Sequence, residues 1–487
     1  MQTRFLNGGG SDDAALMLSV SGCRGIVGKT MTPEVAARFA RAFAGWLRER
    51  VGREAITVVL GRDGRAGGEA LLGAAAQALA EAGAHVIDLG VATTPTVAVM
   101  VEHHGADGGL VLTASHNPAQ WNGLKALALS EGAKGRCRAP AAEDAQKIID
   151  RFRAGAGAGA GAESATPGSV EADTCGAATH VERVLEALEA ICPIERIKAQ
   201  RFRVVVDSVN ASGVEGARLL LAALGCELTH LHADASGVFP HPPEPTREHL
   251  TELCGRVSRD RADAGFAQDP DADRLAIIDE HGRYIGEEHT LAIAAMAVLP
   301  GTHGACVAAN LSTSRMIDDI APQFGARVAR TAVGEANVAS AMLREGCPIG
   351  GEGNGGVIWP KVAMIRDSLS AMALTLAIMA RDGVSVSSLA ARTPGYVIEK
   401  RKAPVREGLA KAAGEAIAAR FKEHRVDRQD GVRVDFAPGT RFGGADGAWL
   451  HVRASNTEPI MRLIAEAGDA DLARALLDEA EGVVATL

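Results

Sequence analysis

The sequence predicts an α/β protein of three or four domains. The chain has 487 residues, which is more than a single hydrophobic core usually serves. A unit of strand, polar loop, helix, glycine and second strand occurs three times, and this is the order of a βαβ motif. Aromatic residues make up 3% of the chain and hydrophobic residues 47%, so we expect helices packed on sheets through small aliphatic side chains.

The N-terminal part contains the first of these units. Residues 1–15 have the composition of an irregular extension, and a short strand is expected at 16–20. A helix is predicted over 33–50, because Thr32 suits the N-cap and Pro33 the first helical position. The repeated unit then follows as strand 56–60, loop 61–65, helix 69–82 ended by Gly83, and strand 84–89.

Two further copies and three composition changes predict the domain boundaries. The second copy has strand 203–207, loop 208–213, a helix to 224 and strand 226–228; the third has strand 306–310, loop 311–314, a helix to 324 and strand 326–328. Boundaries are expected near the alternating Ala-Gly run 154–162, at 301–304 and at 393–395. The predicted parts are domain 1–153, a Gly/Ala-rich linker or insertion 154–175, and domains 176–300, 301–395 and 396–487, the last with a helix from about 469 to 484.

Charge and composition restrict the ligand class. The formal net charge is −9, and the few aromatic residues argue against a nucleic-acid-binding surface. Eight cysteines without a C-x-x-C pair suit scattered thiols in a reducing cytosol better than disulfides or zinc ligands. The N-terminal residues lack the apolar run of a signal peptide, and no stretch has the length of a membrane span. We therefore expect a cytoplasmic protein, monomeric or homodimeric, that acts on a small molecule.

A serine loop follows the apolar run 109–112, which is expected to be a buried strand. Its residues are Thr113-Ala114-Ser115-His116-Asn117-Pro118, with Lys125 a little further along the chain. Polar loops at strand ends are where α/β proteins place their chemistry, although Ser115 alone would suit an ordinary turn. Upstream, three glycines surround Arg24, which predicts either a tight backbone presenting this arginine to an anion or a turn with a solvated arginine.

A second loop, Asp269-Pro270-Asp271-Ala272-Asp273-Arg274, alternates three carboxylates between apolar segments. In an extended loop the three side chains would point the same way and could bind one hard cation, whereas three charges beside buried strands would be costly alone. A solvated acidic turn is one alternative. A calcium helix-loop-helix site is another, with Glu280 in twelfth position, but Arg274 stands where that loop needs glycine. We favour Mg²⁺, which uses few carboxylates plus phosphate oxygens.

Two further loops are rich in glycine or in hydrogen-bonding side chains. In Gly350–Gly356, five glycines surround Glu352 and Asn354, whose oxygens and amide could bind sugar hydroxyls; a flexible turn is the alternative. The other loop, followed by Glu458 and Pro459, offers a guanidinium, two hydroxyls and an amide, a set that suits a phosphate or the start of a helix. Its residues are Arg453, Ala454, Ser455, Asn456 and Thr457.

Taken in this order, the four loops resemble those of the α-D-phosphohexomutase family, which includes phosphoglucomutase, phosphomannomutase and phosphoglucosamine mutase. The resemblance extends from Arg24 to Pro459. It implies four domains around a central cleft: three similar α/β domains with mixed sheets, and a smaller C-terminal α+β domain that closes over the substrate.

The resemblance also implies a role for each loop. Ser115 would be the phosphoserine and, with Asp269, Asp271 and Asp273, would bind Mg²⁺. The other implied roles fall into three groups: Arg24, His116 and Lys125 at the phosphoryl-transfer site; Arg274, Glu352 and Asn354 at the substrate; and Arg453, Ser455, Asn456 and Thr457 at the phosphate that does not react.

The implied reaction interconverts hexose 6-phosphate and hexose 1-phosphate. Phosphoserine donates its phosphoryl group to the sugar phosphate, and the bisphosphate turns around and returns its other phosphoryl group; a hexose 1,6-bisphosphate would prime the enzyme. Lys125 is the candidate base, with a pKa lowered by burial and nearby cations. The common bacterial loop ends Glu-x-Ser-Gly-His, whereas this one has Asn354 and Gly356, a form similar to phosphoglucosamine mutases or dual phosphoglucomutase/phosphomannomutases. Glucosamine phosphate is therefore the leading substrate, with glucose or mannose phosphates as alternatives.

Two other classes of protein compete with this interpretation. A Mg²⁺-dependent phosphatase would use the Asp loop, with an aspartate nucleophile and no phosphoserine. A non-catalytic sugar-phosphate-binding homologue is the second, and the altered sugar loop at Gly356 keeps it open. All four polar loops are present, which argues against a homologue that has lost its catalytic residues.

Overall fold

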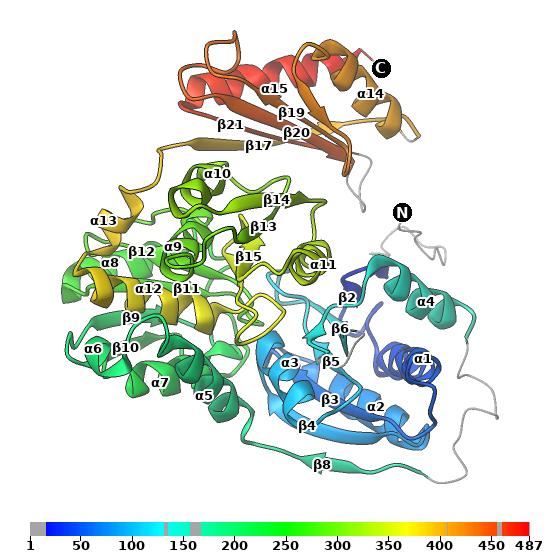
Figure 1. Cartoon of the computed structure of the whole chain (residues 1–487). Coiled ribbons are helices and arrows are strands. Elements are labelled where there is room, and N and C mark those ends of the chain that lie inside the picture. Colours follow the sequence, from blue (N-terminus) through cyan, green and yellow to red (C-terminus); the bar gives the residue numbers. More distant parts are fainter. Residues whose placement is uncertain (1–15, 131–134, 156–166, 407, 455–459, 487) are drawn as a thin grey trace.

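The computed structural model contains four β-sheets with their helices, formed by successive parts of the chain (Figure 1). It describes residues 16–130, 135–155, 167–406, 408–454 and 460–486. Three sheets are mixed and lie against one another, whereas the fourth is antiparallel and stands at one end of the molecule. The predicted α/β class, with three similar domains and a smaller, different fourth, is confirmed.

The first sheet is the largest, with strand order β1-β2-β6-β5-β3-β4-β8 and β7 beside β6. Its first helix begins where predicted, because the Thr32 hydroxyl accepts a hydrogen bond from the Val35 N–H (3.4 Å) and Pro33 opens the helix. The elements are β1 (Met17–Ser19), β2 (Gly22–Ile26), α1 (Pro33–Val51), β3 (Thr57–Arg62), α2 (Gly68–Glu81), β4 (His85–Val91), α3 (Thr94–His103), β5 (Gly108–Leu112), β6 (Trp121–Leu129), β7 (Cys137–Arg138), α4 (Ala142–Arg153) and β8 (Val170–Ala172).

The second and third sheets have four strands each. The second unit comprises α5 (Gly176–Leu188), α6 (Ile194–Lys198), β9 (Arg203–Asp207), α7 (Gly213–Ala223), β10 (Glu227–Leu231), α8 (Thr251–Asp260), β11 (Ala264–Gln268) and β12 (Leu275–Ile278). The third comprises α9 (Glu288–Val298), β13 (Cys306–Asn310), α10 (Met316–Ile320), the 3-10 helix η1 (Ala321–Phe324), β14 (Arg327–Thr331), α11 (Glu335–Glu345), β15 (Ile349–Glu352), β16 (Gly356–Ile358), α12 (Ser368–Asp382) and α13 (Val386–Ala390).

All three mixed sheets contain the same four-strand arrangement. The first strand of each unit has a parallel neighbour on both sides, and the strand after the third returns antiparallel beside it. The orders are β6-β5-β3-β4, β12-β11-β9-β10 and β16-β15-β13-β14. The serine, aspartate and glycine loops each join the third strand to the fourth, so three loops with different chemistry occupy one position of a repeated unit.

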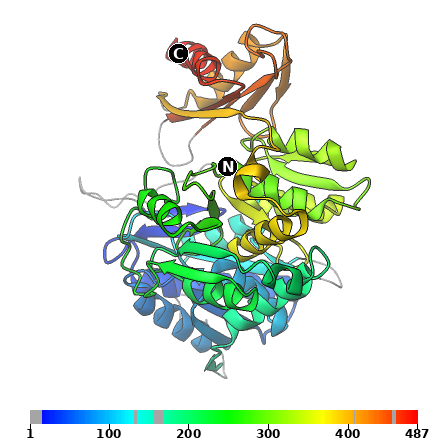
Figure 2. The same ribbon diagram turned by 90° about the vertical axis from the view of Figure 1, so that its left-hand side faces the viewer.

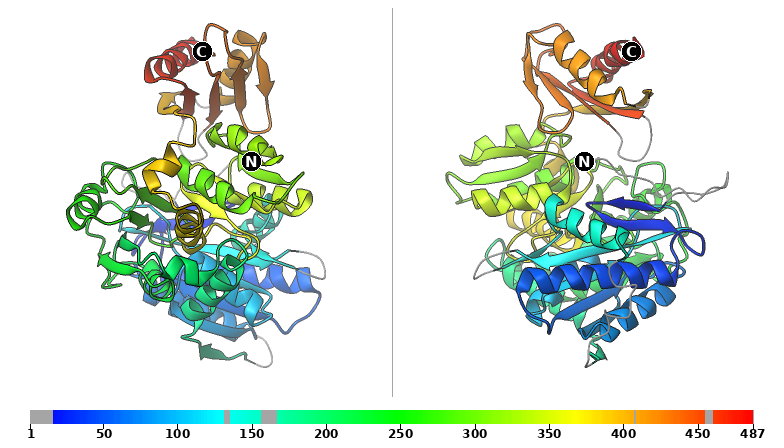
Figure 3. Two further views of the ribbon diagram at one scale, coloured as in Figure 1. Left: turned by 60° about the vertical axis from the view of Figure 1, so that its left-hand side comes forward. Right: turned by 90° about the vertical axis from the view of Figure 1, so that its right-hand side faces the viewer.

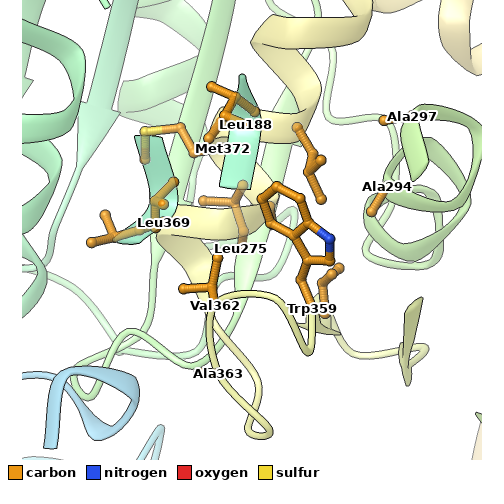
Figure 4. Close-up of a cluster of buried hydrophobic side chains, with 14 of the residues drawn as sticks. Leu188, Leu275, Ala294, Ala297, Trp359, Val362, Ala363, Leu369 and Met372 are labelled. Carbon is orange, nitrogen blue, oxygen red and sulfur yellow. The ribbon is translucent and has the colours of Figure 1, made fainter. Parts of the chain in front are cut away.

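A continuous hydrophobic core joins the three mixed-sheet domains. Trp359 is 1% exposed and lies among Leu275 of β12, Leu188 of α5 and Leu369 of α12 (Figure 4). The same cluster includes residues of α3 in the first domain, such as Val97. Because this core crosses the domain boundaries, the three domains form one support for the loops at their strand ends.

The C-terminal domain has its own core and rests on the third domain (Figures 1, 2 and 3). The Glu466 carboxylate joins the two, accepting hydrogen bonds from the Arg315 N–H (2.9 Å) and the Trp449 indole (2.7 Å). The sheet order is β17-β21-β20-β19-β18. Its elements are β17 (Val397–Pro404), α14 (Ala410–Arg420), β18 (Arg425–Asp427), β19 (Val432–Phe436), β20 (Ala448–Ala454), β21 (Ile460–Ala467) and α15 (Ala470–Ala485).

Two elements differ from the sequence prediction. Residues 170–172, assigned to the linker, form β8, which pairs parallel with β4 and extends the first sheet. The helix expected up to 324 is split into α10 and η1, because Pro322 interrupts the α-helical hydrogen bonds. Within the described ranges, no helix is both long and apolar enough to cross a membrane.

Candidate active site

A buried ion pair holds the serine loop. Arg65 and Asp63 are at most 1% exposed and join through Arg65 Nε and Asp63 Oδ2 (2.8 Å). Arg65 also donates to the carbonyl oxygens of Ser115 and Trp121, and Asp63 accepts from the Thr113 hydroxyl (2.7 Å). A buried charge costs stability unless its hydrogen bonds are complete, so this pair specifies one loop conformation.

The Ser115 hydroxyl lies where the first and second domains meet. Its backbone has φ +50°, a conformation that few non-glycine residues adopt, and the side chain is 2% exposed. Ser115 Oγ donates to Asp269 Oδ2 at 3.0 Å and lies 3.3 Å from His116 Nδ1. The hydroxyl is thus next to both a carboxylate and an imidazole, an arrangement that suits a nucleophilic serine.

The three aspartates converge, but the loop that carries them is not extended as predicted. It turns at Ala272 (φ +51°), and Asp269 Oδ1 accepts from the N–H groups of Asp273 and Arg274 at 3.1 Å. The turn, more than residue alternation, places one oxygen of each carboxylate within 4.8 Å of the others. All three aspartates are fully buried.

This cluster has the donor set of a hard-cation site. Among the described residues, Asp271 Oδ1 and Asp273 Oδ1 are buried without a hydrogen-bond partner. Burial raises the pKa of Asp269 well above its usual value, and the charges of Asp273 and Asp271 raise it further. Unpartnered carboxylate oxygens that repel one another are what a bound Mg²⁺ would satisfy, so the residues fit the ion.

The calcium helix-loop-helix alternative is wrong. The Glu280 carboxylate accepts hydrogen bonds from the backbone N–H (3.1 Å) and the hydroxyl (2.5 Å) of Ser387 at the start of α13, so it is not directed at the aspartates. The segment that follows the aspartate loop is strand β12, where a calcium site of this kind would have a helix.

Lys125 reaches the same carboxylates from β6. Its Nζ donates to Asp271 Oδ2 and Asp273 Oδ2, both at 3.0 Å, and Thr94 Oγ1 donates to Asp271 Oδ2 at 2.6 Å. Burial alone would lower the pKa of Lys125, but the two aspartates outweigh it and raise that pKa. The expected lowering of the Lys125 pKa is therefore wrong for this arrangement, in which the side chain is a cation.

The sugar loop presents Glu352 from the end of β15. Glu352 Oε1 accepts from Asn310 Nδ2 (2.7 Å) and from the Gly334 N–H (3.1 Å). The Asn354 side chain accepts from the Gly356 N–H (3.2 Å), closing its own turn. A Cβ at Gly353 would lie 2.1 Å from a carboxylate oxygen of Glu288, so a side chain at this position would require Glu288 to move.

Arg366 connects the Asp269–Arg274 loop, the predicted metal loop, to the Gly350–Gly356 loop, the predicted sugar loop. The sequence analysis did not identify Arg366. It is 7% exposed, and its guanidinium donates to Asp273 Oδ2 (2.5 Å) and Glu352 Oε2 (2.7 Å). Glu335 accepts from the Arg366 backbone N–H at 2.7 Å. Burial disfavours the charged guanidinium, but Asp273, Glu335 and Glu352 outweigh it and raise the Arg366 pKa. The geometry of one side chain thus couples a predicted cation ligand, Asp273, to the predicted sugar-binding carboxylate of Glu352.

Gly356 leaves the space that Arg366 occupies. A Cβ at this position would lie 2.2 Å from Arg366 Cδ. The glycine, which stands where the common bacterial pattern has histidine, is thereby explained by its neighbour.

We expect Gly356→His to displace Arg366 and to lower the free energy of unfolding by about 1–3 kcal/mol, the usual cost of overpacking. Gly73→His on α2 is the control, since within the described residues nothing lies within 4 Å of a Cβ there. Urea unfolding of both variants measures the difference. Equal stability of the two variants would contradict the role given to Gly356.

Three further predicted residues, Arg24, His116 and Arg274, lie on or near the serine loop. Arg24 on β2 donates to Asn117 Oδ1 of the serine loop (3.0 Å). Glu244 lies 3.7 Å from His116 Nε2 and 3.8 Å from Arg274 Nη1. The charge of Arg274, followed by burial and the charge of Arg24, lowers the pKa of His116, so the imidazole is neutral at pH 7.

The predicted phosphate loop is only partly described. Arg453 is the last residue but one of β20, and its Nε lies 3.4 Å from Asp430 Oδ2. Asp430 accepts from the Val333 N–H of the third domain (3.0 Å). Ser455, Asn456 and Thr457 lie outside the described residues. Their binding of the non-reacting phosphate stays a prediction.

All four parts of the chain match one protein family. The matching descriptions are "Phosphoglucomutase/phosphomannomutase, alpha/beta/alpha domain I" over residues 16–154, domain II over 179–282, domain III over 287–396 and the C-terminal domain over 401–483. These matches, over the repeated unit and its three converging loops, place the chain in the class of phosphohexose mutases, which are intramolecular phosphotransferases. The chain belongs to the phosphoglucomutase/phosphomannomutase family.

Individual relatives agree with this assignment over nearly the whole length. A phosphoglucomutase/phosphomannomutase of Thermococcus kodakarensis is 38% identical and covers 94% of this chain and 96% of its own. A probable phosphoglucosamine mutase of Methanopyrus kandleri is 33% identical and covers 95% of this chain and 96% of its own. The crystal structure of a family protein from Burkholderia thailandensis superposes with a TM-score of 0.79 at 26% identity, covering 96% of both chains.

Proposed function

We propose that this protein interconverts the 6-phosphate and 1-phosphate of a hexose through a phosphoserine at Ser115 and a sugar bisphosphate. The observation that carries the proposal is the Ser115 hydroxyl, which lies 3.0 Å from Asp269 at the edge of the carboxylate cluster. Glu352 stands on the far side of that cluster, joined to it by Arg366. A hexose phosphate between Ser115 and Glu352 would place a hydroxyl at the serine and its ring at the sugar loop.

In the transfer, the bond between phosphorus and Ser115 Oγ breaks as a bond to the sugar hydroxyl forms. The bisphosphate then turns around and returns its other phosphoryl group to Ser115. A magnesium ion held by Ser115 and the three aspartates would neutralise charge on the transferred oxygens. Arg24 and Arg274 add positive charge beside the serine, and His116 Nδ1 is within 3.3 Å of its oxygen.

The hydroxyl proton needs an acceptor, and Lys125 is our candidate. In the present arrangement Asp271 and Asp273 hold it in the charged form. A cation bound to the same carboxylates would weaken that hold and favour release of the lysine proton. Base function of Lys125 therefore depends on the metal site.

Glucosamine phosphate is the leading substrate. The Glu352-Gly353-Asn354-Gly355-Gly356 loop is similar to that of phosphoglucosamine mutases, and the Methanopyrus kandleri relative is named as one. Glucose and mannose phosphates are the second candidates, because the relative at 38% identity is a phosphoglucomutase/phosphomannomutase. The C2 substituent separates these sugars, and discrimination at one small group rests on few contacts.

The test is a mutase assay on the purified chain with Mg²⁺ and a trace of hexose 1,6-bisphosphate as primer. The 1-phosphates and 6-phosphates of glucosamine, glucose and mannose are run in parallel, with and without a chelator. We expect turnover only with Mg²⁺, and the highest kcat/KM for glucosamine phosphate. Preference for glucose or mannose phosphate would retain the reaction and overturn the substrate, whereas binding of all three without turnover would favour a non-catalytic sugar-phosphate-binding protein.

A further inference from the structure

A second cluster of potential metal ligands lies in the second domain, outside the catalytic carboxylates. Asp207 ends β9, His232 follows β10, and His241 belongs to the loop that leads to α8. Asp207 Oδ2 lies 2.9 Å from His232 Nδ1 and 3.1 Å from His241 Nε2, and one ligand atom of each residue lies within 4.8 Å of the others. Asp207 is 2% exposed, and the two imidazoles are 17% and 18% exposed, so the cluster is sheltered but reachable from solvent.

Hydrogen bonding determines which ring nitrogen of His241 carries a proton. Its Nδ1 is 2.8 Å from the Pro242 carbonyl oxygen, which can only accept, so Nδ1 carries hydrogen. In the neutral ring, Nε2 then presents a lone pair to the Asp207 carboxylate, an unfavourable contact between two acceptors. The contact becomes favourable if a second proton is added to His241 or if a metal ion lies between the two atoms.

The same features are those of a histidine that binds a metal. Metal-binding imidazoles usually donate their other N–H to a carbonyl or carboxylate, as His241 does to Pro242. The Asp207 carboxylate is also held in place, because Oδ1 accepts from the Val209 N–H at 2.9 Å. Ligand atoms of a tetrahedral zinc site are about 3.3 Å apart, given metal–ligand bonds of about 2.0 Å. The observed separations of 2.9 and 3.1 Å are close to that value.

We propose that Asp207, His232 and His241 form a binding site for a divalent transition-metal ion of the zinc type. Two imidazoles and one carboxylate suit zinc or cobalt, whereas the all-oxygen set at Asp269, Asp271 and Asp273 suits magnesium. Three protein ligands leave a fourth position for water. The chain would thus carry two metal sites of different chemistry in one domain.

The site is connected to the catalytic loops through a single segment. The loop 232–250 contains His232 and His241, and between them Phe239 lies with its ring centre 5.3 Å from the Arg65 guanidinium carbon. Arg65 is the side chain that holds the Ser115 carbonyl oxygen. Further along, Glu244 meets His116 and Arg274. A metal at the cluster would fix both ends of the stretch that packs on Arg65, so it would be a structural site for the active-site wall.

The experiment measures metal retained by the full-length protein. The chain is stripped with a chelator, incubated with Zn²⁺ in the presence of excess Mg²⁺, freed of unbound metal by gel filtration and analysed by plasma mass spectrometry. Four variants are compared: His232→Asn, which tolerates the positive φ of this position (+47°), His241→Gln, Asp271→Asn and, as a control on α3, His103→Gln.

We expect one equivalent of zinc in the wild type, in Asp271→Asn and in His103→Gln. In His232→Asn and His241→Gln we expect an affinity lower by at least about 10–100-fold, seen as loss of zinc on gel filtration. Replacement by Co²⁺ should give the visible absorption of a tetrahedral nitrogen–oxygen site in the first three proteins. Hydrogen exchange of residues 233–250 should slow on zinc binding in the wild type. Substoichiometric zinc in the wild type, or equal retention by all variants, would overturn the proposal and leave a hydrogen-bonded Asp–His–His cluster with a protonated His241.

Discussion

Ser115→Ala is expected to lower kcat/KM by at least about 10³-fold, because the variant lacks the oxygen that carries the phosphoryl group. The free energy of unfolding should change little. The hydroxyl that is lost makes a hydrogen bond to Asp269 and a contact with His116. The φ of +50° at this position is as unfavourable for alanine as it is for serine, so it adds no difference in stability. Stopped assays of both reaction directions, with Mg²⁺ and the bisphosphate primer, measure the loss.

The control for this prediction is Ser21→Ala, on an exposed turn, which should keep wild-type activity. Sugar-phosphate binding by Ser115→Ala, followed calorimetrically, should persist because Glu352 is intact. Mg²⁺ should still bind, but more weakly, because the three aspartates remain and one proposed ligand is lost. Full turnover by Ser115→Ala would contradict the account and would favour a phosphatase that uses an aspartate of the Asp269–Arg274 loop as nucleophile.

Arg366→Met is expected to lower the free energy of unfolding by about 3–5 kcal/mol at pH 7, the usual cost of removing one partner from a buried charge network. Asp273, Glu335 and Glu352 would lose their common counter-charge. In the wild type, burial opposes ionisation of Asp273, but Arg366 and Lys125 outweigh it and lower its pKa. We also expect kcat/KM to fall by about 10²-fold, because the metal loop and the sugar loop lose their connection.

The pH dependence of this variant follows from the same shifts. A carboxyl group whose pKa is lowered in the folded state stabilises the protein above the unfolded pKa, and the effect is lost as pH falls. The stability gap between wild type and Arg366→Met should therefore be at its full size above pH ~4, the unfolded aspartate value, and should narrow as the pH falls below it toward the lowered folded pKa of Asp273. Arg344→Met is the control, since its ion pair with Glu345 is exposed to solvent and should contribute little to stability. A gap independent of pH would contradict the charge network.

The features that a local pattern determines could be predicted from the sequence. Helix α1 begins at Pro33 after its Thr32 cap, and Ser115 and Asp269 each follow a short apolar run that is indeed a strand. The three similar α/β domains were predicted from the threefold repetition of one strand–helix unit. Each of these signals depends on residues that are close together in the sequence, so one sequence is enough to recognise it.

The contacts made by single side chains across domains could not be predicted in this way. Arg366 and Asp273 form a hydrogen bond although they are 93 residues apart in the chain, and Arg366 lies in a segment without any motif. The sequence showed Arg65 only as a member of a polar loop. Its hydrogen bond to the Ser115 carbonyl oxygen depends on how the ends of two strands lie next to each other. The predicted lowering of the Lys125 pKa was wrong for the same reason. Burial of Lys125 was expected from the sequence, but its hydrogen bonds to two carboxylates of another domain were not.

Mass spectrometry of the phosphorylated chain tests the central claim most directly. The protein is incubated with Mg²⁺ and a hexose 1,6-bisphosphate, and its peptides are mapped before and after addition of unlabelled hexose monophosphate. The account predicts one phosphoryl group on Ser115, lost when the monophosphate is added and recovered as sugar bisphosphate. A chain that turns over the sugar phosphate while Ser115 is never phosphorylated, or that carries the group on an aspartate, would contradict it.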